Sequence, residues 1–198
     1  MKLYDVPFSG NCYKIRLFLS LLGKEYESVP INFTHGDHLS PSFQLLNPRG
    51  QVPVLEDDGV VIWDSTAILV YLARRYGGEN WLPLDAKDLA LVTQWLAVAQ
   101  NEILYGLARA RAVLKLKRPW NLQECQKIGQ DILKVLQNHL AQHPWLALDR
   151  VTIADIACFP YVALAPEGDV PLGDYPAVLQ WISRIKALVG YRSMPGID

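Results

Sequence analysis

The pattern of the sequence changes once, near residue 77, and this change limits the folds that the chain can adopt. Before it, short apolar segments typical of strands alternate with amphipathic helical segments. After it, the apolar residues recur with helical spacing and no segment is convincing as a strand. We therefore predict an α/β domain at residues 1–77, a short linker at 78–86 and an all-helical domain at 87–198.

The α/β domain is predicted to open with a strand, a helix and a second strand. The segment "KLYDV" is a short strand candidate, and Gly23 ends an amphipathic helix that we place at 11–22. A second strand is predicted at 26–32. A helix between two strands is typical of the parallel β-α-β unit.

A hairpin and a helix complete this domain. Strands are predicted at Val52–Glu56 and Val60–Trp63, and Asp57-Asp58-Gly59 supplies the turn between them. The polar connection before the hairpin has room for one short helix near 42–46. The segment "STAILVYLARRY" is predicted to be a helix, with Ser65 as its N-cap candidate.

Four helices are expected in the second domain, at 87–116, 122–140, 151–164 and 175–189. The first is a single long helix with one apolar stripe. Thr152 and Asp155 form the S/T-x-x-D pattern that caps a helix start, which places the beginning of the third helix.

Composition and charge argue against several classes of function. The formal net charge is −1, so nothing indicates a nucleic-acid partner. No apolar run is long enough to cross a membrane. The three cysteines, Cys12, Cys125 and Cys158, form no Cys-x-x-Cys pair and have no zinc-site spacing. We therefore expect a soluble cytoplasmic protein of a reducing compartment, with no metal site.

The start of the first predicted helix, in "VPFSGNCYKIRL", carries the first chemical candidates. The hydroxyl of Ser9 either caps the helix or donates to an anion held near the helix N-terminus. Cys12 falls in the first turn, where the helix dipole lowers a thiol pKa, unless it is a small buried residue. Taken alone, the junction favours the structural interpretation of both residues.

Two other segments offer binding groups at the ends of strands. Asp64-Ser65 is either an anion-binding helix N-terminus or an ordinary cap. Val52-Pro53 stands at the start of a predicted strand, and proline has no backbone N–H to donate to the hydrogen bonds of a sheet. If this bond is cis, the backbone of Val52 can pair with a peptide-like ligand, and a trans proline is the alternative.

The order and spacing of these segments resemble a cytosolic glutathione transferase over nearly the whole chain. The resemblance rests on "SGNCYKIRL", "NPRGQVPVL", "WDSTAILVYLARRYG", "WLPLD" and "VTIADIACF". It is closest to the serine-type branches (theta, delta and zeta), with a short bacterial-like chain. It implies a thioredoxin-like N-terminal domain (βαβ-ββα), an all-α C-terminal domain, glutathione as co-substrate, and a homodimer.

The resemblance also implies roles for the residues that bind glutathione. Ser65 would bind the γ-glutamyl carboxylate, and Asp64 would lie near the γ-glutamyl amino group. Val52, ahead of a cis Pro53, would pair with the cysteinyl backbone. A second set of residues, His38 and Gln51, would reach the glycyl carboxylate.

Three residues compete for the sulfur atom. Ser9 falls on the serine that activates the thiol in the serine-type branches, and Asn11 and Cys12 are the alternatives. If Cys12 is the reactive group, the protein is a glutathione-dependent thiol-disulfide reductase or peroxidase. A third possibility is a non-catalytic binding or scaffold protein that keeps the fold.

The second substrate is expected to be a small hydrophobic electrophile that binds between the domains. The long helix presents Tyr105 and Arg109 on a second face, and we assign both to this pocket, with domain or subunit packing as the alternative. The thiolate would attack an electrophilic carbon in a detoxification-type conjugation. An apolar pocket has no spacing code, so the sequence does not identify the electrophile.

Overall fold

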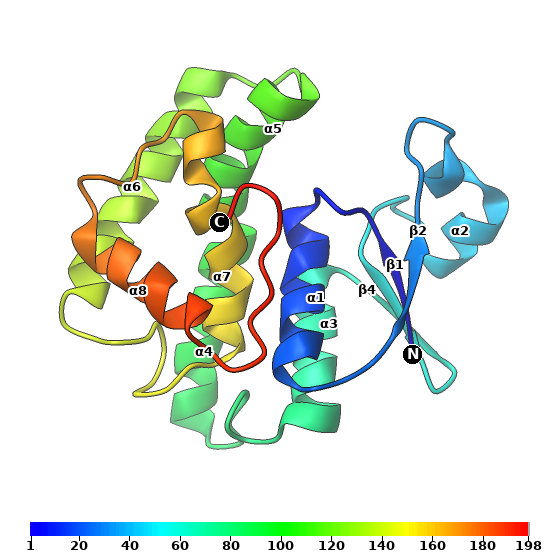
Figure 1. The fold of residues 1–198 in the computed structure, drawn as a ribbon, viewed down its shortest axis with the longest axis horizontal. Helices are drawn as coiled ribbons and strands as arrows, with labels where there is room; N and C mark the ends of the chain where they lie inside the picture. Colours follow the sequence, from blue (N-terminus) through cyan, green and yellow to red (C-terminus); the bar gives the residue numbers. More distant parts are fainter. Residues whose placement is uncertain (198) are drawn as a thin grey trace.

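The computed structural model describes residues 1–197 and has two parts, a sheet with helices on its inner side and a helical bundle (Figure 1). The first part contains β1 (Lys2–Asp5), α1 (Gly10–Leu21), β2 (Glu27–Pro30), the 3-10 turn η1 (Asp37–Leu39), α2 (Pro41–Leu46), β3 (Val54–Asp57), β4 (Val60–Trp63), α3 (Ser65–Leu72) and the π-helical turn η2 (Ala73–Gly77). The predicted βαβ-ββα order is confirmed.

The four strands form one mixed sheet in the order β2-β1-β3-β4. β1 and β2 run parallel through the α1 crossover, whereas β1-β3 and β3-β4 are antiparallel. The β3-β4 loop is closed by Asp58 and Gly59, which have φ values of 49° and 78°. Two positive φ angles match the twist of a two-residue hairpin, so the hairpin prediction is confirmed.

The second part is all helical. It contains α4 (Ala86–Gln100), the π-helical segment η3 (Leu104–Ala108), α5 (Arg109–Leu116), α6 (Leu122–Leu140), α7 (Ile153–Ala163), the 3-10 turn η4 (Ala165–Gly168) and α8 (Pro176–Lys186). Within residues 1–197, no helix is long and apolar enough to cross a membrane.

The predicted single helix at 87–116 is interrupted. Asn101 leaves helical geometry with φ −111° and ψ −93°, and its side-chain amide donates to the carbonyl of Ala97 at 2.9 Å. The π segment follows where the chain packs on α6, because a Cβ atom on Gly106 would lie 2.5 Å from the backbone nitrogen of Gly129. Apolar spacing does not predict this interruption, because apolar residues such as Ile103 and Leu107 continue at helical spacing through it.

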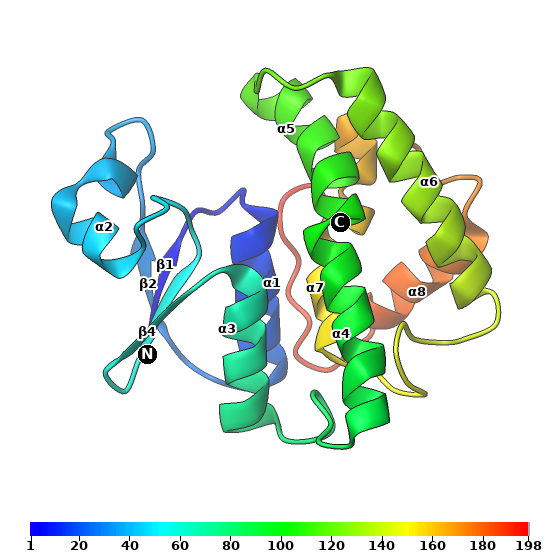
Figure 2. The ribbon, with the colours of Figure 1, turned by 180° about the vertical axis from the view of Figure 1, so that it is seen from behind.

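Helix α7 joins the two parts. α1 and α3 lie side by side between the sheet and α7, as both views show (Figures 1 and 2), and α7 also packs against α4. All residues from Ile153 to Val162 are buried. A helix buried on every side cannot use water for its free N-terminal N–H groups, so its start needs partners from the protein. The carbonyl of Trp81 accepts from the N–H of Ile153 at 3.1 Å, and the Thr152 hydroxyl accepts from the N–H of Ala154 at 3.3 Å.

The Asp155 carboxylate holds Thr152 and the neighbouring segments in place. One oxygen accepts from the backbone N–H of Thr152 at 2.9 Å, which with the Thr152 hydroxyl completes the predicted capping box. The other oxygen accepts from the N–H of Leu146 at 3.1 Å and from the indole of Trp181 at 2.9 Å. One buried carboxylate therefore holds the start of α7, the preceding loop and α8 together.

We expect Asp155→Ala to lower the free energy of unfolding by about 4 kcal/mol, because four buried donors, the Thr152 hydroxyl included, lose their acceptor and each costs about 1–3 kcal/mol. Urea denaturation measures the difference. Asp149→Ala is the matched control, since this aspartate of the same loop is exposed, and it should change stability by less than about 0.5 kcal/mol. Equal effects of the two substitutions would contradict the assigned role of Asp155.

Candidate functional site

Three of the predicted segments meet at one end of the sheet. In the antiparallel registers Tyr4 pairs with Val54, and Val54 pairs with Trp63. The end of β1, the start of β3 and the end of β4 therefore lie side by side. This arrangement brings together the turn that carries Ser9, the Val52-Pro53 segment and the Asp64-Ser65 junction.

Ser9 is the N-cap of α1. Its backbone N–H donates to the carbonyl of Val6 at 3.0 Å, and its hydroxyl oxygen accepts from the N–H of Cys12 at 3.2 Å. A hydroxyl that accepts one hydrogen bond keeps its own proton as a donor. The neutral sulfur of Cys12 is a weak acceptor within reach of this proton, so an anionic ligand sulfur would compete for it successfully.

Cys12 is completely buried. Burial and, to a smaller extent, the nearby Asp5 carboxylate together raise the pKa of its thiol to about 12, whereas the Ser9 hydroxyl opposes the shift. The thiol is therefore protonated at neutral pH. Of the two interpretations of the sequence, the structure matches the small buried residue, because the loss of hydration outweighs the helix dipole.

Asp64, and not the predicted Ser65, is the N-cap of α3. Its carboxylate accepts from the N–H of Thr66 at 2.9 Å, and Ser65 is the buried first residue of the helix. Asp64 has a φ of 75°, which non-glycine residues rarely adopt. The sequence could not place the cap because aspartate and serine are equally good N-caps.

Gln100 of α4 is a polar contact that the sequence did not reveal. Its amide donates to the Asp64 carboxylate at 2.9 Å and to the Thr66 hydroxyl at 2.7 Å. Arg49 lies 3.9 Å from the other oxygen of Asp64. The helical domain thus supports the strained cap directly. A single glutamine on an amphipathic helix has no local signal that could have predicted this contact.

The Val52-Pro53 peptide bond is cis, as the resemblance implied. The hydrogen-bonded pairing of β3 with β1 begins at Val54, whereas the sequence predicted that this strand begins at Val52. Pro53 has no N–H to donate to the pairing. The side chain of Asn47 donates to the carbonyl of Gln51 at 2.8 Å and holds the loop ahead of the proline.

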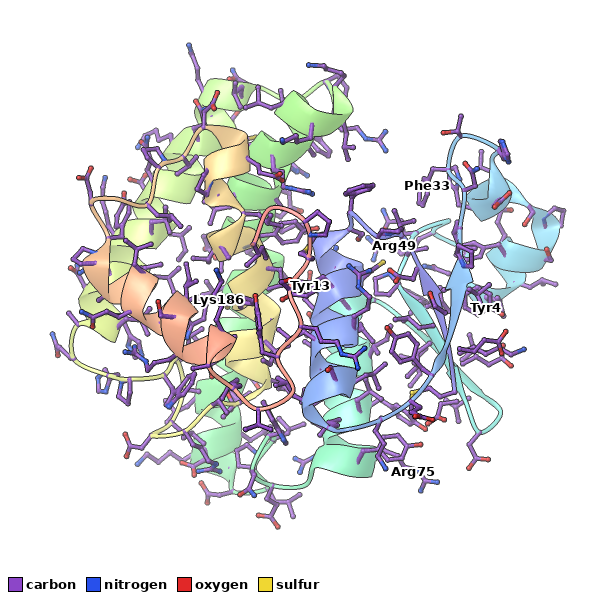
Figure 3. The ribbon with its side chains drawn as sticks, viewed as in Figure 1. Tyr4, Tyr13, Phe33, Arg49, Arg75 and Lys186 are labelled. Atoms are coloured by element: carbon purple, nitrogen blue, oxygen red, sulfur yellow. The ribbon has the colours of Figure 1, made fainter. Side chains whose placement is uncertain are left out.

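His38 lies beside this loop. Its ring stacks on Phe33 with centroids 4.1 Å apart, and a Cβ atom on Gly50 would lie 3.0 Å from the carbonyl oxygen of His38. Among the described residues, the buried His38 Nδ1 has no hydrogen-bond partner. Figure 3 shows Phe33 and Arg49 toward the end of the sheet where α1 begins, and His38 lies at this end because its ring stacks on Phe33.

The structure does not join Tyr105 or Arg109 to the Ser9 turn. The Arg109 guanidinium lies between the rings of Tyr105 and Trp120, 4.0 Å and 4.8 Å from their centroids. Within residues 1–197 no hydrogen bond or ion pair links either predicted residue to Ser9. The residue of α5 that does reach the turn is Arg111, which donates to the carbonyl of Phe8 at 3.1 Å.

Tyr161 of α7 covers the start of α1. A Cβ atom on Gly10 would lie 2.7 Å from its ring. One turn later, the ammonium of the buried Lys14 lies 5.5 Å from the centroid of the same ring. Burial lowers the pKa of Lys14 to about 8. The helical domain therefore contacts this helix start closely.

These features define a class of protein: a thioredoxin-like domain with an attached helical domain, whose sheet end offers two helix N-termini and a free backbone segment to an anionic, peptide-like ligand. The comparisons identify the family. The glutathione S-transferase N-terminal domain matches residues 1–74, and the C-terminal domain of that family matches residues 120–188.

Relatives and solved structures agree. Glutathione S-transferase D7 of Anopheles gambiae is 31% identical over 93% of this chain and 85% of its own length. A glutathione S-transferase structure from Pseudomonas fluorescens has a TM-score of 0.90 and 34% identity, and covers 100% of this chain and 98% of its own. A glutathione transferase homologue from Drosophila mojavensis, solved with bound glutathione, has a TM-score of 0.86 and 25% identity over 94% of this chain and 87% of its own. The chain belongs to the glutathione S-transferase family of transferase enzymes.

We expect Gly10→Ala to lower the free energy of unfolding by about 1–3 kcal/mol, because the added methyl group overlaps the Tyr161 ring. Thermal or urea denaturation measures the effect. Gly173→Ala is the control, since a Cβ atom there meets nothing within 4 Å. If both variants are as stable as the parent chain, the close contact between Tyr161 and the start of α1 is wrong.

Proposed function

We propose that this chain conjugates the thiolate of glutathione to small hydrophobic electrophiles, and that Ser9 activates the thiol. The observation that carries the proposal is the position of Ser9: its hydroxyl sits at the N-terminus of α1, at the same end of the sheet as the cis proline and the cap of α3. The family assignment supports glutathione as the thiol, and the bound glutathione of the Drosophila mojavensis homologue adds to that support.

Glutathione would lie across this end of the sheet. We place its γ-glutamyl carboxylate at Ser65 and its amino group near Asp64, whose second oxygen is 3.9 Å from Arg49. Its cysteinyl backbone would pair with Val52, which precedes the β1-β3 ladder. For the glycyl carboxylate we propose His38, with its unpaired buried nitrogen within the described chain, and the exposed Gln51.

The energetics of activation are modest. A thiol of pKa about 8.5 is only a few per cent ionised at neutral pH, and lowering this pKa by about two units requires roughly 2.7 kcal/mol. A charge-assisted hydrogen bond from Ser9 supplies about 1.5–3 kcal/mol, and the α1 N-terminus adds about 0.3–1 kcal/mol. These two contributions are sufficient.

The chemical step is a substitution or an addition at carbon. The thiol releases its proton to solvent, and the thiolate electron pair forms the sulfur–carbon bond. In a substitution, the leaving group departs with the electrons of the bond that breaks. The exposed Phe8, next to Ser9, and the Tyr105-Arg109 pair are proposed to border the electrophile.

We also propose that the chain forms a homodimer. A cytoplasmic location is proposed on the family assignment alone. An apolar groove of about 460 Å³ runs between α3 and α4, with Val70, Leu89 and Leu96 among its lining residues. The neighbouring edge strand β4 exposes Val60, Val61 and Trp63. These surfaces support a subunit contact through α3, α4 and β4 (Figure 2).

We expect Ser9→Ala to lower kcat/KM for an activated aryl chloride by about 10- to 100-fold, the equivalent of a lost charge-assisted hydrogen bond, and to change the glutathione Kd by less than about threefold. Steady-state kinetics and calorimetry measure the two quantities. Asn121→Ala is the control, because it removes the N-cap of α6 and leaves the site unchanged.

Two outcomes would contradict this proposal. Unchanged turnover in Ser9→Ala would show that another group activates the sulfur. Absence of glutathione binding to the parent chain in the calorimeter would favour a non-catalytic binding or scaffold protein.

The reductase alternative through Cys12 makes a different prediction. Because Cys12 is buried and its thiol has a pKa of about 12, we expect oxidised glutathione to leave the folded protein unmodified at this residue. Mass spectrometry of the intact chain, with Cys12→Ala as the control, detects the gain of about 305 Da that a glutathione mixed disulfide would cause. Rapid appearance of this adduct at Cys12 under native conditions would favour the reductase.

A further inference from the structure

Two arginines hold the three carbonyl groups ahead of Ser9. Arg16 of α1 donates to the carbonyls of Val6 at 3.3 Å and Pro7 at 2.8 Å. Arg111 of α5 donates to the carbonyl of Phe8 at 3.1 Å. Arg16 belongs to the same domain as the turn, whereas Arg111 reaches it from the helical domain.

Arg111 is itself held in place. Its side chain is 10% exposed, and its Nε donates to the carboxylate of Glu167 in η4. Lys115 lies 3.3 Å from the other oxygen of Glu167. Burial opposes ionisation, but the hydrogen bonds and charges of Arg111 and Lys115 keep the pKa of Glu167 below its usual value. Glu167 is thus a fixed anion that orients the guanidinium toward Phe8.

The hydrogen bond from Arg111 to Phe8 acts on the peptide group that joins Phe8 to Ser9. The carbonyl of Phe8 and the N–H of Ser9 belong to one planar peptide group. The carbonyl accepts from Arg111, and the N–H donates to Val6 at 3.0 Å. With both sides of the plane fixed, the rotation of this peptide is restricted, and the direction of the Ser9 hydroxyl follows from it.

We propose that Arg111 is a positioning residue for the Ser9 hydroxyl, through which the helical domain sets the ionisation of the glutathione thiol. The inference rests on the proposed function, since it requires that Ser9 faces the sulfur. Arg111 contacts neither the reacting atoms nor the Ser9 side chain, and it acts through the Phe8–Ser9 peptide.

Other charged and titratable groups surround the turn and are constant in the comparison below. From β1 and α1 these are the ion pair of Asp5 with Arg16 and the buried Lys14, and from α7 the phenol of Tyr161. Burial raises the pKa of the Tyr161 phenol and the charge of Arg111 opposes this rise, but Arg111→Lys keeps a positive charge at this position. A shift of the thiol pKa in this variant therefore reports the lost geometry of the Arg111 contact.

The test is the apparent pKa of the thiol in bound glutathione, followed by the ultraviolet absorbance of the thiolate across a pH titration. A lysine at position 111 keeps the charge but cannot bond to Glu167 and Phe8 together with the planar geometry of arginine. We expect Arg111→Lys to raise this pKa by about one unit, from about 6.5 to about 7.5, which lowers the thiolate fraction at about pH 7 roughly threefold, with the glutathione Kd changed less than about twofold.

A double-mutant cycle separates positioning from general support of the fold. Arg111→Lys in a Ser9→Ala background should shift the thiol pKa by less than about 0.3 unit, because the hydroxyl that it positions is absent. Arg74→Lys is the matched control: Arg74 also joins two segments by donating to backbone carbonyls, those of Leu82 at 2.8 Å and Pro83 at 2.7 Å, away from Ser9. It should leave the thiol pKa unchanged.

Three results would overturn the inference: no shift in Arg111→Lys, an equal shift in the Ser9→Ala background, or an equal shift in Arg74→Lys. If Arg111→Lys does not fold, Glu167→Gln replaces it, since that variant keeps Arg111 and loosens its hold, and a shift of the same sign is expected. Failure of the proposed function is distinct, because then Ser9→Ala alone leaves the thiol pKa unchanged.

Discussion

The burial of α7 is the constraint on which both domains depend. This helix lies at the centre of the molecule and packs against α1, α3 and α4, so neither domain has a complete core without it. Its burial is possible because the Asp155 carboxylate accepts hydrogen bonds from groups that have no access to water. The same helix carries Tyr161, which packs on the first turn of α1. The packing that stabilises the protein is therefore also the packing that positions the candidate site.

The site relies on fixed dipoles and hydroxyl groups more than on charged side chains. Two helices begin there, and each has a side-chain cap, Ser9 for α1 and Asp64 for α3. Both caps are supported from the helical domain, the first through Arg111 and Phe8 and the second through Gln100. Both caps are fixed by hydrogen bonds within the protein, which is the property of a preorganised site. The Cys12 thiol, in the first turn of α1, is completely buried in the core.

The elements and the family follow from local pattern. Helical spacing located α6 and α8, the Asp58-Gly59 turn located the hairpin, and the capping box located the start of α7. The sequence pattern predicted the bounds of helices and strands less well where tertiary contacts determine the local structure. The long helix of the second domain is interrupted at Asn101, ahead of the segment in which Gly106 packs closely against Gly129. β3 begins at Val54 because Pro53 has no donor for the ladder. The cap of α3 is Asp64 because the chain adopts a positive φ there, which no propensity predicts.

The sequence by itself determined the two-domain order and the spacing of the apolar faces, because these depend on spacing along the chain. Its resemblance to a family implied the residues that we propose for glutathione. Only the tertiary structure decided which groups meet. It placed Arg111, and not Arg109, on the Ser9 turn, and it placed Gln100 on Asp64. It also left Cys12 without water, which raised its pKa where the helix dipole alone would have lowered it. The reason is the same in each case: hydrogen bonding and hydration depend on distances between segments that are far apart in the sequence.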